Sequence, residues 1–377
     1  MAGIYLHIPF CKRACHYCNF HFSTQVVGIE PFVQALQKEI DLTFSNENSR
    51  ESISTLYFGG GTPSLLSESQ LGEILNSISK KCRLEADVEI TLEANPDDIS
   101  KEKLKQWHSL GINRLSLGVQ SFSNEELKWM NRVHDARQSQ ESIDLILASD
   151  IDNFSADLIF GSPLMSDREL TDALNWLSSK KIPHLSCYAL TVEQGTALHH
   201  AIKQQKSAPA DPEKQASQFL LTMDVLEAAG YEQYEISNYA LPGKRSRHNS
   251  SYWMGLPYYG FGPSAHSFDG VRKRSWNVSN NQTYIRSLQE NKIPTEEEVL
   301  NEAQQANEFI MTSLRKREGL SLAEFQRRYG KNRLELLQKD LKIPLGEEKV
   351  IDDKGCIKLT RTGKLFADGI AADLFQD

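Results

Sequence analysis

The chain has 377 residues, of which 40% are apolar and 24% are charged, the balance of an ordinary globular protein. Its formal net charge of −8 at pH 7 argues against a nucleic-acid-binding surface. No apolar run reaches the roughly 20 residues that span a bilayer, and no basic segment followed by a long apolar one marks a signal peptide. We therefore expect a cytoplasmic protein without a membrane span, built from one large α/β domain and a smaller one.

Strand-like and helix-like segments alternate from residue 1 to about residue 240. Strands are expected at 4–7, 53–58, 88–92, 114–118, 154–160, 184–190 and 234–237, and helices at 31–44, 68–80, 101–110, 124–130, 137–149, 168–180 and 212–229. This alternation predicts βαβ units and a parallel sheet. Six or so units would form an incomplete barrel with an open side, whose site lies where the strands end. A dinucleotide-binding sheet is the weaker alternative, since no GxGxxG follows the first strand.

The rest of the chain differs in composition. Residues 238–295 contain many Asn, Ser, Gly, Pro and aromatic residues, which predicts a loop-rich connector over the barrel. Residues 296–377 predict helices at 297–317, 321–329, 333–341 and 362–375 with a short strand at 355–359. The expected domains are therefore a barrel at 1–237, the connector, and a small helical or winged-helix-like C-terminal domain that caps the barrel.

Three cysteines follow the first strand in a C-x3-C-x2-C pattern, at Cys11, Cys15 and Cys18. Pro9 prevents a helix here, so the cysteines lie on a loop that can turn three thiolates toward one point. Clustered thiolates favour zinc or an iron–sulfur cluster. A structural zinc site normally has four ligands, whereas a cluster with three cysteines leaves one iron open. The zinc alternative would take its fourth ligand from His7, His16 or His21.

Other candidate residues also follow strands. Gly59-Gly60-Gly61-Thr62-Pro63 would let the backbone approach a ligand and grip a charged amino-acid group, although it is equally typical of a tight turn. Glu93 and Asp157 would accept hydrogen bonds from an ammonium or a ribose hydroxyl, and Arg132 would pair with a carboxylate. Tyr17 would stack on a planar ligand. Taken singly, each of these side chains is also consistent with a surface charge or with simple packing.

The connector contains the run His248-Asn249-Ser250-Ser251-Tyr252-Trp253, with Lys244, Arg245 and Arg247 beside it. A histidine, two large aromatic residues and three cations suit a flat, dianionic, metal-bearing ligand such as haem. Imidazole ligates iron, aromatic rings stack on the macrocycle, and cations pair with propionates. The alternative is a loop anchored by buried aromatic residues.

Together these motifs resemble the radical S-adenosylmethionine (SAM) superfamily. The resemblance implies a 4Fe-4S cluster held by the three cysteines, with SAM chelating the fourth iron through its amino and carboxylate groups. It also implies that the cluster delivers an electron that cleaves SAM to a 5′-deoxyadenosyl radical. By motif position the SAM-contacting residues would be Tyr5, Gly60, Gly61, Thr62, Glu93, Gln120, Arg132, Asp157 and Ala189.

Within this superfamily, nearly the whole chain resembles the branch of oxygen-independent coproporphyrinogen III oxidase, which also contacts a second SAM. The oxidase has a fourth cysteine two positions after the third, where this chain has Phe20. The pattern C-x3-C-x2-C-x-F, together with residues 248–253, resembles the HemW-type family of haem chaperones, although members commonly have Asp where this chain has Asn19. That resemblance implies haem binding and transfer to haem-requiring membrane enzymes, with the cluster and SAM supporting transfer or dimerisation. The alternative is oxidative decarboxylation of coproporphyrinogen III.

Overall fold

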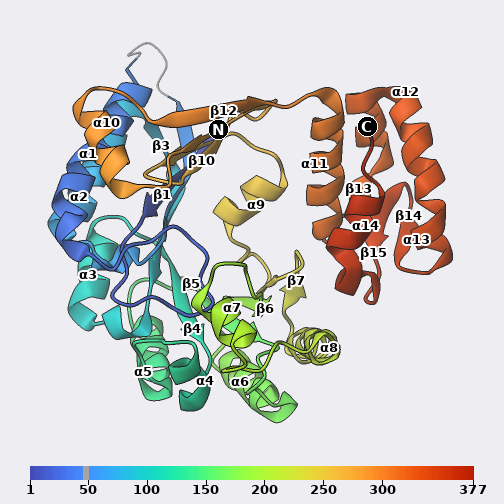
Figure 1. The fold of residues 1–377 in the computed structure, drawn as a ribbon, viewed down its shortest axis with the longest axis horizontal. Helices are drawn as coiled ribbons and strands as arrows, with labels where there is room; N and C mark the ends of the chain where they lie inside the picture. Colours follow the sequence, from blue (N-terminus) through green and yellow to red (C-terminus); the bar gives the residue numbers. More distant parts are fainter. Residues whose placement is uncertain (46–50) are drawn as a thin grey trace.

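A computed structural model of the protein describes residues 1–45 and 51–377 (Figure 1). Within these residues one sheet has twelve strands, in the order β12-β11-β10-β9-β1-β2-β3-β4-β5-β6-β8-β7. Its middle part is parallel and open-sided, which confirms the predicted incomplete barrel. The parallel strands are β1 (Ala2–Ile8), β2 (Ser52–Gly60), β3 (Arg83–Ala94), β4 (Arg114–Gln120), β5 (Asn153–Phe160) and β6 (His184–Ala189).

Eight helices follow these strands in the described residues, and their starts agree with the sequence signals. Ser67 and Ser166 form capping boxes, each accepting from the backbone N–H three residues on. Helix α7 was not predicted. The helices are α1 (Ile29–Thr43), α2 (Glu68–Lys81), α3 (Lys101–Ser109), α4 (Asn124–Trp129), α5 (Ala136–Leu147), α6 (Asp167–Ser179), α7 (Ala197–Lys203) and α8 (Pro212–Ala228), with 3-10 turns at Val26–Gly28, Pro63–Leu65 and Pro96–Asp98.

Side chains alternate between the two faces of each barrel strand, and the two faces differ in polarity. On β1, Ile4, Leu6 and Ile8 are fully buried in the main hydrophobic core, whereas Tyr5 and His7 point to the opposite face. The same alternation puts polar residues of the other strands on the concave face. The barrel therefore has an apolar outer layer under its helices and a polar interior.

The expectation for residues 234–237 is wrong. They are not a strand, and they lie between β7 (Glu232–Gln233) and β8 (Asn238–Ala240), which pair antiparallel. Strand β8 also pairs antiparallel with β6, so this hairpin ends the sheet at one edge. Residues 234–237 connect two very short strands in a tight hairpin, and such short strands give little alternating pattern in the sequence.

The expectation of a loop-rich connector at 238–295 is also wrong. This stretch forms elements that extend the sheet past β1, because β9 pairs parallel with β1. Its strands are only three to five residues long, so they carry little periodic signal. The elements are α9 (Arg247–Trp253), β9 (Tyr258–Phe261), β10 (His266–Phe268), β11 (Lys273–Asn277), α10 (Asn281–Gln289) and β12 (Thr295–Val299).

The C-terminal part has its own hydrophobic core and stands beside the barrel, joined to it through β12 (Figure 1). Gly330, with φ of 84°, breaks α12 at the place where the sequence predicts a gap between two helices. No helix among the described residues is both long and apolar enough to cross a membrane. The elements are α11 (Glu302–Arg315), β13 (Leu320–Ser321), α12 (Leu322–Asp340), α13 (Lys342–Gly346), β14 (Val350–Asp353), β15 (Cys356–Leu359), a 3-10 turn at Gly363–Phe366 and α14 (Ala367–Asp373).

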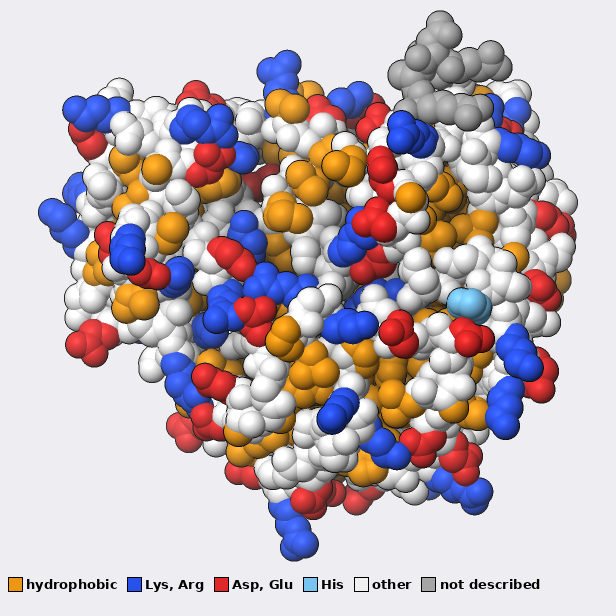
Figure 2. Space-filling view, turned by 180° about the vertical axis from the view of Figure 1, so that it is seen from behind, with side chains coloured by type: hydrophobic (Ala, Val, Ile, Leu, Met, Phe, Trp, Pro, Cys, Tyr) orange, Lys and Arg blue, Asp and Glu red, His pale blue; other side chains and the backbone are white. Residues whose placement is uncertain are grey.

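Ion pairs join the C-terminal part to the barrel. Arg245 bonds Glu232 of β7 and Glu318 beyond α11, both at 2.8 Å, and Arg361 pairs with Asp224 of α8 at 2.5 Å. Figure 2 shows the face behind that of Figure 1, where charged side chains of both signs gather between the C-terminal part, on the left, and the barrel. These ion pairs fix the position of the C-terminal part relative to the barrel.

Candidate functional site

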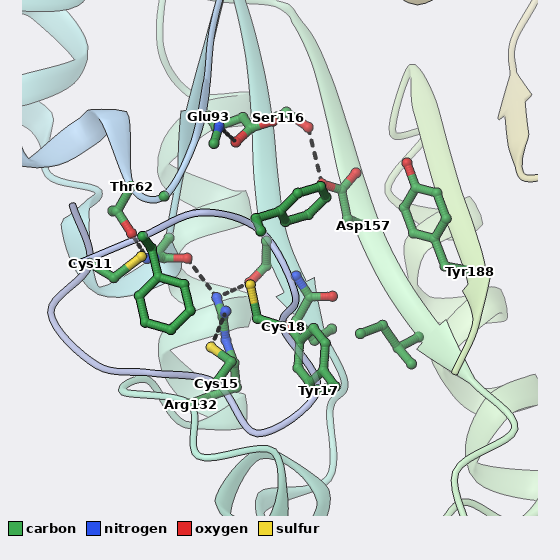
Figure 3. Close-up of a pocket in the computed structure, with 18 of the residues that line it drawn as sticks. Cys11, Cys15, Tyr17, Cys18, Thr62, Glu93, Ser116, Arg132, Asp157 and Tyr188 are labelled. Atoms are coloured by element: carbon green, nitrogen blue, oxygen red, sulfur yellow. Dashed lines mark hydrogen bonds between the residues drawn. The ribbon is translucent and has the colours of Figure 1, made fainter. Parts of the chain in front are cut away.

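The three motif cysteines lie on the loop after β1 and line a cavity of about 500 Å³ where the barrel strands end (Figure 3). The fold brings nearly the whole expected cluster and SAM set to this cavity. The expected residues that line it are Cys11, Cys15, Tyr17, Cys18, Gly60, Gly61, Thr62, Glu93, Gln120, Arg132, Asp157 and Ala189.

The cysteine loop is fixed by one backbone hydrogen bond within the loop and by one hydrogen bond from a side chain beyond α4. The N–H of Cys11 donates to the Ser23 carbonyl at 3.0 Å, which closes the loop on itself. The Asn131 side chain donates to the Ala14 carbonyl at 2.7 Å, which ties the loop to the segment after α4. The positions of the thiols therefore depend on contacts far away in the sequence.

Arg132 connects the cysteine loop to two barrel strands. Its Nη1 donates to the sulfur of Cys15 at 3.2 Å, and its Nη2 donates to Asn95 at 2.6 Å and to the Gly118 carbonyl at 3.1 Å. Its Nε is buried without a partner in the described residues. Arg132 therefore fixes the position of the Cys15 sulfur relative to β4 and to the residue that follows β3.

The donor set fits an iron–sulfur cluster. Burial raises the pKa of the Cys11 thiol to about 11 and raises the pKa of Cys18, so a ligand must displace these protons on binding. Among the described residues, no three His, Cys, Asp or Glu side chains converge as they do around a single metal ion. A cluster binds each cysteine through a different iron and thus suits more widely spaced sulfurs. The alternative zinc ligands His7, His16 and His21 do not line this cavity.

Two partly buried carboxyl groups line the same cavity. Glu93 accepts hydrogen bonds from the Tyr57 hydroxyl at 2.8 Å and from the Gly60 N–H at 3.1 Å, and burial raises its pKa to about 7. Asp157 accepts from Ser116 at 3.0 Å, and its other oxygen is buried without a partner in the described residues. Burial also raises the pKa of Asp157. A buried acceptor without a donor indicates a place for a ligand that supplies one.

The glycines bring β2 against the cysteine loop. A Cβ on Gly61 would lie 2.6 Å from the Phe10 carbonyl oxygen and 2.8 Å from that of Ile8. Gly60 has a φ of 104°, which side-chain-bearing residues rarely adopt. The Gly61 N–H donates to the Ile8 carbonyl at 2.9 Å. Position 60 therefore requires glycine for its backbone conformation, and position 61 requires it for the close contact with the cysteine loop.

Several residues that the sequence reasoning missed also line the cavity. Ser116 precedes Gln120 by four positions on β4, and Ser186 precedes Tyr188 by two on β6. The two-residue period of the strands would have pointed to them once the inner face was known. Asn95, which accepts a hydrogen bond from Arg132, also lines the cavity, and its position two residues after Glu93 is the sequence signal for it.

A second cavity, of about 830 Å³, lies between β9–β11 and the C-terminal helices α11 and α12. It contains Tyr5, so the structure does not bring this expected SAM contact to the cysteine cavity. Asn19 and Phe20 line both cavities, and the Phe20 side chain is 66% exposed. The residue that replaces the fourth cysteine of the oxidase pattern therefore stands between the two spaces.

The four expected haem-binding residues lie on α9, but they do not line one common cavity. Tyr252 and Trp253 line the second cavity, and Asn249 lines the first. His248 is buried and lines neither, because its ring nitrogens share hydrogen bonds with the Thr55 and Tyr252 hydroxyls, each at 2.8 Å. Burial lowers its pKa to about 3. The expected grouping of all four residues around one ligand is not what the structure shows.

The three cations expected beside this segment also point elsewhere. Lys244 lies 3.7 Å from Asp152, and Arg247 pairs with Asp87 at 3.1 Å. Arg245 forms the ion pairs with the C-terminal part described above. None of the three lines the second cavity.

Comparison with known proteins agrees with the architecture. Residues 5–177 match the model of the radical SAM superfamily, and residues 300–366 match the HemN C-terminal domain. The structure of coproporphyrinogen III oxidase (HemN) from Escherichia coli superposes with a TM-score of 0.86 at 22% identity, covering 100% of this chain and 90% of that one. This likeness establishes the fold.

The sequence relatives are more specific. The protein named heme chaperone HemW from Bacillus subtilis is 35% identical, over 98% of this chain and 98% of its own length. The protein of the same name from Mycobacterium tuberculosis is 33% identical, over 99% of this chain and 94% of its own. The chain therefore belongs to the HemW family of heme chaperones, within the radical SAM superfamily.

Proposed function

We propose that this protein binds haem in the cytoplasm and passes it to acceptor haemoproteins, including membrane-bound respiratory enzymes. The observation that carries the proposal is the position of Phe20, which lines both the cysteine cavity and the second cavity. The oxidase pattern has its fourth cysteine at this position, and this chain has phenylalanine instead. An exposed phenyl ring cannot ligate a metal or move a proton, but it provides an apolar surface for a planar ligand.

The cysteine cavity would hold a 4Fe-4S cluster through Cys11, Cys15 and Cys18, with SAM beside it. The cluster supplies an iron with an open coordination position and the ability to transfer one electron. The backbone of Gly60 and Gly61 approaches the amino-acid portion of SAM. Arg132 pairs with its carboxylate.

The acidic side chains complete this assignment. Glu93 and Asp157 accept hydrogen bonds from the ammonium and the ribose hydroxyls, and both present oxygens inside the cavity. Tyr17, Thr62, Gln120 and Ala189 form the remaining wall. The cluster and SAM support haem transfer or homodimer formation in this proposal, without turnover of a porphyrinogen.

The second candidate function is oxygen-independent oxidation of coproporphyrinogen III, which the fold likeness to HemN favours. One pair of experiments separates the two. Haem is titrated into the purified protein and the Soret band is followed, and we expect saturation near one haem per chain. The protein with reconstituted cluster is then incubated anaerobically with SAM, a reductant and coproporphyrinogen III, and we expect no vinyl product.

Two results would overturn the proposal. Formation of protoporphyrinogen IX at many turnovers per chain would make the protein an oxidase. Absence of a Soret shift at any haem concentration would remove haem as its ligand. Light scattering with and without cluster and SAM tests the homodimer separately.

A further inference from the structure

We infer that haem occupies the second cavity, between the β9–β11 strands and the C-terminal helices, with His266 rather than His248 as the ligand of the iron. The inference rests on the proposed function and adds to it the place of the ligand and the coordinating atom. Its support comes from four properties of the cavity: size, aromatic walls, charge, and a histidine whose ring faces the space.

The size and the walls suit a planar macrocycle. A volume of about 830 Å³ lies in the upper part of the range of ligand sites in proteins. Aromatic side chains come from both sides, from the sheet and from the C-terminal helices, and Tyr252 meets Tyr258 edge to face at 4.6 Å. The aromatic residues lining the cavity are Tyr5, Phe20, Tyr252, Trp253, Tyr258, Phe268, Phe309 and Tyr329.

The charge of the cavity is complementary to two propionates. Arg274, Lys316 and Arg328 line it, opposed by the carboxyl groups of Glu308 and Glu324, which leaves an excess of one positive charge. Arg274 pairs with Glu308 at 2.8 Å, and Arg328 pairs with Glu324 at 2.6 Å.

Lys316 is the cation best placed to receive a carboxylate. Burial is the main cause that lowers its pKa, and Arg328 lowers it further, against the opposing effect of Glu318. An anion bound beside Lys316 would favour its charged form and would gain a partly desolvated partner.

His266 has the free imidazole of the cavity. It lies on β10 two residues before Phe268, so the two side chains are on the same face of the sheet, and both line the cavity. Partial desolvation, with a smaller effect of Arg274, lowers its pKa, and the neutral form is the one that binds iron.

The other histidines that line this cavity are already engaged. The two ring nitrogens of His7 share hydrogen bonds with the Tyr5 hydroxyl at 3.1 Å and the His21 carbonyl at 2.8 Å. The Nε2 of His21 shares one with Asn281 at 2.7 Å. Among the histidines that line this cavity, His266 is therefore the one for which neither ring nitrogen has a hydrogen-bond partner in the described residues.

His248 is a positioning residue in this arrangement. Its ring stacks on Tyr57 with centroids 4.9 Å apart, and it holds the hydroxyl of Tyr252 at 2.8 Å. Loss of His248 would move Tyr252, which contacts the macrocycle, and would weaken binding of any porphyrin. Loss of His266 would weaken only the binding of a porphyrin that contains iron.

This difference defines the experiment. Ferric haem and metal-free protoporphyrin IX are titrated separately into the full-length protein and into His266→Ala, His248→Ala and the control His108→Ala, whose histidine is exposed on α3. For His266→Ala we expect about a tenfold higher Kd for haem and an unchanged Kd for protoporphyrin IX. For His248→Ala both Kd values rise together. Added imidazole restores the low-spin spectrum of haem in His266→Ala only.

Each failure has a separate meaning. If the unmodified protein binds neither porphyrin, the proposed function fails. If it binds haem, but His266→Ala retains its affinity and spectrum, the inference fails while haem binding stands. If His248→Ala loses haem selectively and keeps protoporphyrin IX, His248 is the ligand and the inference is overturned. Thermal unfolding of each variant confirms that the fold is retained, which we expect because His266 is exposed.

Discussion

Nδ1 of His248 lies 2.8 Å from the hydroxyl of Thr55, and this hydrogen bond joins α9 to the inner face of β2. The carboxylate of Glu89 accepts from the backbone N–H groups of Arg247 and His248, at 3.2 and 2.9 Å, so it also satisfies the start of the helix. Helix α9 is therefore fixed by the polar interior of the barrel. Because its side chains contribute to both cavities, this anchoring sets the wall between them.

Replacing Thr55 by valine tests the anchor. The substitution keeps the shape but leaves a buried imidazole nitrogen without its partner, so the free energy of unfolding should fall by about 1–3 kcal/mol. Urea unfolding of both proteins measures the difference. Thr43→Val, at the exposed end of α1, is the matched control and should change stability little. Equal effects of the two substitutions would contradict the anchoring role.

Alanine at Gly61 tests the contact between β2 and the cysteine loop. A Cβ would lie 2.6 Å from the Phe10 carbonyl oxygen, so backbone must move, and we expect destabilisation together with loss of iron from the reconstituted protein. Gly346→Ala in α13 meets nothing within 4 Å and should be stabilising by up to about 1 kcal/mol. Iron content and thermal unfolding are the measurements. An iron-loaded Gly61→Ala protein of normal stability would contradict this account.

Lysine at Arg132 tests the role of the guanidinium. A single ammonium cannot bond Cys15, Asn95 and the Gly118 carbonyl together as the two terminal nitrogens do. We expect about tenfold weaker SAM binding by anaerobic calorimetry. Arg137→Lys, on an exposed i,i+4 pair of α5, should leave SAM affinity unchanged. Unaltered affinity in Arg132→Lys would remove this residue from the SAM site.

Glutamine at Glu39 tests a buried carboxyl group of α1 that contacts β11, α10 and the residue after β9. Burial raises the pKa of Glu39 to about 7, although hydrogen bonds from Tyr284, Gly262 and Asn277, at 2.6, 2.9 and 2.5 Å, oppose the shift. Because the folded state binds this proton more tightly than the unfolded state does, its contribution to stability is lost as pH rises from about 4.5 to about 7.

The expected result is a difference in pH dependence. The unmodified protein should lose up to about 3 kcal/mol between pH 5 and pH 8 relative to Glu39→Gln, which has no titrating group there. The variant should also carry a constant loss, because its amide nitrogen faces other donors. Urea unfolding at the two pH values measures both effects, and the exposed Glu30→Gln is the control. Parallel pH profiles of the variant and the unmodified protein would show that Glu39 is ionised throughout.

Much of the cysteine cavity was predictable because the chain order of strands and loops determines it. Cys11, Gly61, Glu93, Gln120 and Asp157 all lie near the carboxyl end of a parallel strand, and parallel strands bring these ends to one edge. Alternating patterns are long enough in these units to be read from sequence. The strands of residues 258–299 are too short for that, and the pairing of β9 with β1 joins segments that are far apart in the sequence.

The cavities that residues 248–253 line could not be predicted from the sequence. Its histidine and aromatic residues predict a common ligand when they are read as a loop. On a seven-residue helix they do not share one cavity: His248 bonds Thr55 in the barrel interior, whereas Tyr252 and Trp253 line the second cavity. Thr55, which binds His248, is 193 positions away, and no local pattern predicts that contact.

The sequence alone therefore determined the superfamily, the barrel and the three thiols, because spacing along a loop and periodicity along strands are local properties. The tertiary structure decided which residues share a cavity. It placed Tyr5 away from the cysteines, divided the 248–253 segment between two spaces, and brought His266 opposite the C-terminal helices. These outcomes depend on packing between distant segments, and the free energy of such contacts exists only once the chain has folded.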